Sequence, residues 1–211
     1  MLVPIQQIVT FANDPFRGNP AFVVTPSVPL PVSLLHQLCG HLREIMIAVV
    51  TPGDDGLGVL NRPKDVTPKD GDLGVSFVTP TGFHPGAGHA THAAAWVALN
   101  TLRPNETKAE LWLDSGKSRA IRAEGDLISV DWPIMPYAGA DLRATLRDAL
   151  GALPLATYEA AFGAVAVFDS EDAVIALTPD QGKILALPFD TVMVTAPARH
   201  ADFAIRVFAP K

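Results

Sequence analysis

The sequence predicts an α+β fold in which a curved sheet surrounds a central helix, and two observations support this prediction. Short apolar runs rich in Val, Ile and Phe recur between proline and glycine residues, as strands separated by turns do. The segment 90–100 instead contains an unbroken apolar run, so a helix there would be apolar around its whole circumference. Such a helix has to be enclosed on all sides, and strands before and after it can enclose it.

The apolar runs define the strands that we expect. They cover 8–11, 21–24, 45–50, 75–78, 111–113, 127–130, 164–168 and 191–195.

Two further segments have helical periodicity and one apolar side. The first spans 32–42, with Ser33 as its expected N-cap, and places four leucines on one side. The second spans 141–150, has a leucine at every fourth position and ends before Gly151, a typical C-terminal stop. Both helices are expected at a surface.

Composition limits the possible partners. The 211 residues are 48% hydrophobic and carry a net charge of −6, and they show no clustered excess of Lys and Arg, which argues against nucleic-acid binding. A single cysteine, Cys39, excludes an intrachain disulfide and fits a reducing compartment. The sequence contains neither a signal peptide nor a membrane-spanning run, so we expect a cytoplasmic protein that acts on small molecules.

The glycine-rich stretch GFHPGAGHATHAAAWVAL, residues 82–99, is a candidate anion site. Backbone N–H groups at the start of a helix have no partner within it and lie at the positive end of the helix dipole. A substrate carboxylate could therefore dock on the amides of Gly88, His89 and Ala90. The alternative is an ordinary tight turn into a helix, for which glycine is often used.

The histidines of this stretch raise a second alternative. His84, His89 and His92 could bind a metal, and the chain would then be a metal-dependent hydrolase. No cysteine or carboxylate stands near them in the sequence, so we expect no metal.

Three segments resemble the phenazine-biosynthesis PhzF-like isomerases, a family with the diaminopimelate-epimerase fold. They are VTFANDPFRGNPAFVV (9–24), FVTPTGFHPGAGHATHAAAW (77–96) and DFAIRVFAP (202–210), and the most specific motifs are PFRGNP and GHAT. The resemblance extends over the whole chain. It implies an epimerase-like domain over 1–118 with its central helix at 90–100, and a second one over 119–211. It also implies an active site between two domains, no cofactor and a homodimer.

The resemblance also implies the site residues. Gly88 and His89 match the Gly-His pair that holds and polarises the substrate, and Asn19 and Ala90 join them as substrate-binding residues. Glu44 matches by position the glutamate that moves the proton, since it follows the first helix and precedes the strand. In a second register the catalytic position falls on Val49, and the catalytic glutamate is then lost.

The chemistry suits a partly buried carboxylate. Moving a proton between carbons requires a base with a pKa raised by burial, so that it accepts and returns the proton near neutral pH. Without the resemblance, Glu44 would be a solvated residue at a helix end. A separate alternative is a catalytically silent binding or interaction protein that retains the fold.

The two halves differ at their ends. FVTP at 77–80 leads into the central helix, whereas FAP at 208–210 is followed by one residue. We therefore expect an incomplete second repeat, in which Val165, Val167, Val192 and Val194 lack a covering helix. Either the sequence is a fragment of a longer product, or another chain covers this face.

Overall fold

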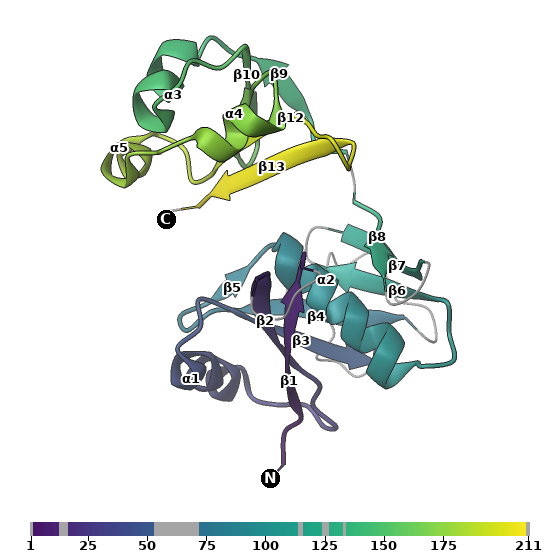
Figure 1. Ribbon diagram of the computed structural model, residues 1–211. Coiled ribbons are helices and arrows are strands. Elements are labelled where there is room, and N and C mark those ends of the chain that lie inside the picture. Colours follow the sequence, from purple (N-terminus) through teal and green to yellow (C-terminus); the bar gives the residue numbers. More distant parts are fainter. Residues whose placement is uncertain are drawn as a thin grey trace. The chain divides into compact units, whose positions relative to one another are not determined.

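The computed structural model divides the chain into two compact units, Met1–Pro133 and Ile134–Lys211 (Figure 1). It describes residues 2–12, 17–52, 72–113, 116–123, 127–132 and 134–209. The division lies after Pro133, whereas the sequence placed it after Ser118. The reason is that β7 (Gly116–Arg122) pairs with β6 (Lys108–Leu113), and β8 (Ile128–Val130) pairs with β7, so the first sheet continues past that position.

The first unit is an eight-stranded sheet around one helix, as the α+β prediction requires. Its order is β1-β2-β3-β4-β6-β7-β8, and β5 pairs with β4. The remaining strands are β1 (Ile5–Thr10), β2 (Asn19–Val24), β3 (Ile47–Pro52), β4 (Leu73–Val78) and β5 (Phe83–His84).

Two helices cover opposite faces of this sheet. α1 (Val32–Leu42) packs through Leu35 and Cys39 on one face, and α2 (Gly88–Val97) packs through its alanines on the other. Strands covered on both faces are apolar at successive positions rather than at alternate ones, which explains why every residue of β4 is buried.

The first helix has the predicted bounds but not the predicted cap. Pro31 is the N-cap and no side chain caps the helix, so the expectation for Ser33 is wrong. Proline fixes φ at about −65°, a value compatible with the start of a helix, and Pro31 O accepts from the amides of Leu34 and Leu35.

The second unit has five strands and three helices on one face. The sheet order is β13-β12-β11-β10-β9, from β9 (Tyr137–Gly139), β10 (Ala156–Ala160), β11 (Gly163–Val167), β12 (Val192–Pro197) and β13 (Phe203–Phe208). The helices α3 (Arg143–Leu150), α4 (Glu171–Ala176) and α5 (Gln181–Ala186) form a core with Ala164, Ala166, Val192 and Val194.

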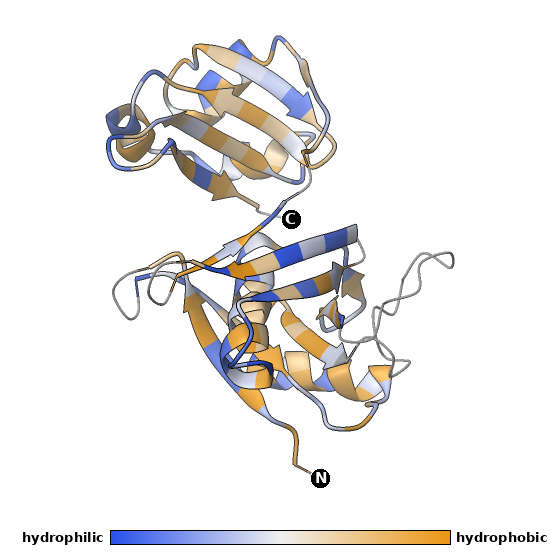
Figure 2. Cartoon of the chain, turned by 90° about the vertical axis from the view of Figure 1, so that its right-hand side faces the viewer, coloured by the Kyte–Doolittle hydropathy of each residue, from blue (hydrophilic) through white to orange (hydrophobic). Residues whose placement is uncertain are grey.

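The other face of this sheet, which we call the open face, is uncharged. The register places Tyr158, Val165, Val167, Met193, Ile205 and Val207 on it. No described helix of this unit packs there, and Figure 2 shows these strands mostly orange. The expectation that Val192 and Val194 lie on this face is wrong, because they lie opposite Ala164 and Ala166 and so face the helices.

Among the described residues, no helix has the length and apolar character that crossing a membrane requires.

Candidate active site

The candidate site residues predicted from the sequence lie at one end of the first sheet. β2 runs parallel to β3 with Phe22 beside Ile47, so Asn19 and Glu44 each precede that pair by three residues. Ile47 also lies opposite Val78, and β4 leads from there through β5 into the start of α2. Asn19, Glu44 and the first turn of α2 therefore belong to the same end of the sheet.

Glu44 follows directly on the end of α1. Arg43 is the C-cap in the left-handed conformation, with φ of 58°, and the Glu44 amide donates to Cys39 O at 3.3 Å. The strand begins only at Ile47, so Arg43 and Glu44 both lie in the connection between α1 and β3. Glu44 is half-buried, and among the described residues no cation lies within ion-pair distance of it.

A hydrogen bond connects α1 to the segment before α2. His36 Nδ1 lies 2.6 Å from Thr79 O, and because a carbonyl only accepts, this nitrogen carries the proton. Thr79 Oγ1 in turn accepts from the Gly82 amide at 3.0 Å, which closes the turn before β5. Sequence reasoning missed His36 and Thr79, because nothing in their spacing signals a contact 43 residues apart.

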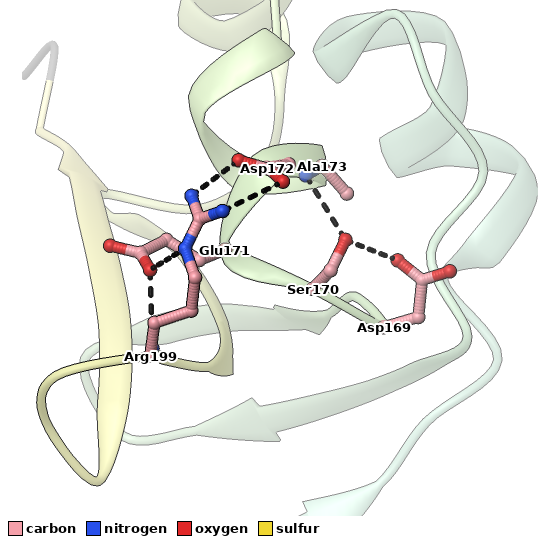
Figure 3. Close-up of polar contacts among 6 residues, drawn as sticks. All are labelled: Asp169, Ser170, Glu171, Asp172, Ala173 and Arg199. Atoms are coloured by element: carbon pink, nitrogen blue, oxygen red, sulfur yellow. Dashed lines mark hydrogen bonds and ion pairs between the residues drawn. The ribbon is translucent and has the colours of Figure 1, made fainter.

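No side chain caps the start of α2. Ala87 is the N-cap, its methyl group accepts no hydrogen bond, and the first turn carries no acidic residue. α4 shows the ordinary alternative (Figure 3): Ser170 caps the Ala173 amide, and Glu171 stands in the first turn. The first-turn amides of α2 therefore keep their capacity to bind an anion.

Space is left beside the first residue of α2. A Cβ added to Gly88 would meet no atom within 4 Å, and its φ is not positive. Neither crowding nor backbone conformation within the described chain requires glycine here, although glycine weakens a helix. Close approach of a ligand to the backbone is another reason for glycine at this position.

His89 is neutral at physiological pH. Burial lowers the pKa of its half-buried imidazole, because the charged form loses hydration. A neutral ring can donate one hydrogen bond and accept another, which suits a group that polarises a substrate oxygen.

The structure corrects the expectation that the central helix is enclosed on all sides. α2 begins at Gly88 and continues into a π-helical turn, Ala98–Leu102, so it starts earlier than the expected 90–100. Gly88, His92 and Trp96, spaced by four, form one stripe between the edge strands β1 and β8. Trp96 keeps 37% of its surface exposed because neither edge strand covers this stripe.

The histidines do not form a metal centre. No group of three potential ligands is assembled within the described ranges. His84 Nδ1 accepts from the Gly86 amide, and His92 Nδ1 lies 3.0 Å from Gly88 O. The metal-dependent hydrolase therefore lacks support.

The structure describes the PFRGNP motif only in part, and it buries Val49, the catalytic position of the second register. Pro15 and Phe16 lie outside the described residues, and Asn19 is exposed with its carbonyl accepting from the Thr10 hydroxyl at 2.9 Å. Val49 is buried in the α1 face of the sheet, beside Leu35.

Comparison with known proteins agrees with this architecture. No protein-family model matches the chain. An uncharacterized isomerase of Pseudomonas aeruginosa is 30% identical over 213 residues, a match that spans all of this chain and 74% of the relative. A phenazine biosynthesis protein of the PhzF family from Enterococcus faecalis superposes with a TM-score of 0.81 at 24% identity, covering 100% of this chain and 74% of that one. A structure described as a predicted epimerase from P. aeruginosa superposes at 0.60 with 18% identity, over 90% and 68% of the two chains.

These relationships define the class of protein as an isomerase with an epimerase-like α+β fold. The chain belongs to the PhzF family of phenazine biosynthesis-like proteins.

Proposed function

We propose that this isomerase moves a proton on a small carboxylate-bearing metabolite by acid–base catalysis. The substrate carboxylate docks on the amides of Gly88, His89 and Ala90, and Glu44 accepts the proton from the adjacent carbon and returns it. His89 donates a hydrogen bond to the oxygen on which charge develops. Asn19 helps to orient the substrate from the same end of the sheet.

One observation carries this proposal: the register of β2, β3 and β4 assigns the half-buried Glu44 and the uncapped start of α2 to one end of the sheet. Among the described residues, no cation lies within ion-pair distance of the Glu44 carboxylate. The residues of this chain supply an acid–base group and an anion site, which proton transfer requires.

The test is incorporation of solvent deuterium into candidate 2-amino and 2-hydroxy acids, followed by proton NMR in D₂O. Glu44→Gln removes the base but keeps the shape, so the exchange rate should fall by about 10²- to 10⁴-fold. Glu159→Gln, at an exposed strand position of the second unit, is the matched control and should exchange like the wild type. Exchange that survives unchanged in Glu44→Gln would remove Glu44 from the mechanism.

A further inference from the structure

A second cavity of the first unit, which we call the π-turn pocket, lies at the end of α2 that is remote from Gly88. It has a volume of about 490 Å³, and its lining includes Pro4, Gln6, Val50, Leu73, Leu102 and Arg103. Leu73 begins β4, whereas Val78 ends that strand beside the candidate active site, so the two sites lie at opposite ends of the sheet. At 1.5 Å per residue, roughly 20 Å of helix separates Gly88 from Thr101.

The π-helical turn that follows α2 forms one side of the pocket. The Arg103 amide donates to Ala98 O at 2.9 Å, five residues earlier, so the turn holds one residue more than an α-helical turn. Such turns are rare and are frequent at functional sites. The side chains of Gln6 and Thr101 donate hydrogen bonds to each other, both at 3.2 Å, and join the turn to β1. Thr101, Leu102 and Arg103 all line the pocket.

Arg103 supplies the charge of the pocket. Among the described residues that line it, Arg103 alone is charged, and its side chain keeps only 19% of its surface exposed. The Glu106 carboxylate lies 3.8 Å from Arg103 Nη1, beyond hydrogen-bond distance, and the Glu106 side chain is 53% exposed. Within the described ranges, no residue accepts a hydrogen bond from this guanidinium. Because a largely buried guanidinium has five N–H donors to satisfy, an anion in the pocket would stabilise it.

The rest of the lining suits an aliphatic molecule with one negative charge. Val50 and Leu73 are buried core residues, Leu102 lies beside them in the lining, and no aromatic ring contributes among the described lining residues. A single carboxylate balances the one positive charge of Arg103, whereas a phosphate dianion would leave a negative charge unpaired. Arginine can also hold both oxygens of a carboxylate through two parallel N–H···O bonds.

We propose that the π-turn pocket is a second binding site, for a small aliphatic carboxylic acid. The carboxylate pairs with Arg103, and the aliphatic chain packs against Val50, Leu73 and Leu102. This site is separate from the proposed docking of a substrate carboxylate at Gly88, so it does not depend on the proposed function.

The test is a titration of the methyl- and amide-labelled protein with octanoate, followed by NMR. The methyl groups of Val50, Leu73 and Leu102 should shift together as octanoate enters the pocket. Octanamide has the same aliphatic chain without the charge. It should bind at least about tenfold more weakly at these methyl groups, because a hydrogen bond to a charged group usually contributes this much. This comparison uses the wild type, so it does not depend on the folding of a variant.

Arg103→Met should weaken octanoate binding at the same methyl groups by about tenfold or more, and Arg103→Lys, which keeps the charge, should recover part of the loss. Arg147→Met is the matched control, since Arg147 is an exposed arginine of α3 that pairs with Asp148, and should leave the binding unchanged. Equal binding of octanoate and octanamide, unchanged binding in Arg103→Met, or no shift at the three methyl groups would overturn the inference.

A last variant separates this inference from the proposed function. Gly88→Ala alters the proposed carboxylate site at the other end of α2 and should leave the octanoate shifts of Val50, Leu73 and Leu102 unchanged. Loss of these shifts in Gly88→Ala would also overturn the inference, because octanoate would then act through the start of α2. Deuterium exchange in Glu44→Gln tests the proposed function whichever result the octanoate titration gives.

Discussion

Among single residues, Gly88 is the one whose proposed role in binding opposes its effect on the stability of the fold. Glycine weakens a helix because its backbone loses more freedom on folding than that of other residues. The structure offers neither crowding nor a positive φ to explain it, and the proposed docking of a substrate carboxylate at the helix start supplies a reason. Stability and activity should therefore respond to substitution in opposite directions.

Gly88→Ala should stabilise the fold by about 0.5–1 kcal/mol, because alanine has less freedom to lose on folding. It should also weaken carboxylate binding, because the methyl group enters the space beside the helix start. Urea unfolding and deuterium exchange measure the two effects.

Gly40→Ala is the matched control, since Gly40 lies within α1 and an added Cβ would likewise meet nothing within 4 Å. It should stabilise to a similar extent and leave exchange unchanged. Loss of stability in Gly88→Ala, or exchange at the wild-type rate, would contradict the assignment.

His89 should make the fold sensitive to acid. Burial lowers the pKa of His89 in the folded state, whereas in the unfolded chain it stays near the ordinary value of about 6.5. Below that pH the unfolded state binds more protons, so this histidine's contribution to stability is present above it and is lost as the pH falls toward the folded-state pKa. His89→Gln should therefore lose less stability than the wild type between pH 7.5 and pH 5.5, as measured by urea unfolding midpoints. An identical loss in both proteins would show that His89 is not buried as described.

Among the elements, α4 is contacted by two arginines, one in β13 and one in the loop before it, and the two contacts differ in burial. Arg206 of β13 donates to the carbonyls of Val174 and Leu177 at 2.9 and 3.2 Å and is partly buried. Arg199, in the loop before β13, pairs with Glu171 and Asp172 at the surface (Figure 3). Water replaces the surface pairs readily, but it replaces the bonds to the end of α4 less well.

Arg206→Met should therefore destabilise the second unit by about 2 kcal/mol, because two helix-end carbonyls lose a charged donor. Arg199→Met serves as the matched control and should change the unfolding midpoint little, with an effect that shrinks further in high salt. Equal losses in the two variants, measured by urea unfolding, would show that exposure does not decide the value of these contacts.

The elements also show how far sequence reasoning reaches. Periodicity predicted α1 with its observed bounds and located the buried strands β2, β3 and β4, because a run of apolar residues reports burial directly. The stripe of α2 was missed because Trp96 is apolar yet partly exposed, and exposure there depends on where the edge strands β1 and β8 end.

The candidate site was predictable only in part. GHAT marked the start of α2, and the position of Glu44 after a helix suggested it as the proposed base. The contact between His36 and Thr79 depends on tertiary structure, and no local pattern encodes it.

At the scale of the whole molecule, the open face of the second sheet predicts association. Ile205 and Val207 keep 45% and 52% of their surfaces exposed, and the face carries no charge that would disfavour contact. A sheet with water on one side normally alternates apolar and polar residues, and this one is apolar on both faces.

Ile205→Lys should therefore lower the apparent mass by light scattering and reduce binding of the dye ANS, because a charge on the open face opposes contact with another apolar surface. Ile175→Lys is the matched control, since Ile175 is an exposed residue of α4, and should leave both unchanged. A wild-type monomer that binds no ANS would contradict the prediction.

If a substrate carboxylate docks at the start of α2 beside Glu44, as proposed, both parts of the site should respond to the same ligand. The most direct measurement is a titration of the labelled protein with lactate, followed by NMR of the backbone amides and of the side-chain carboxyl carbons. The amides of Gly88, His89 and Ala90 should shift together with the Glu44 carboxyl carbon, and at the same lactate concentration. Shifts at these amides with none at Glu44, or shifts confined to other parts of the chain, would contradict it.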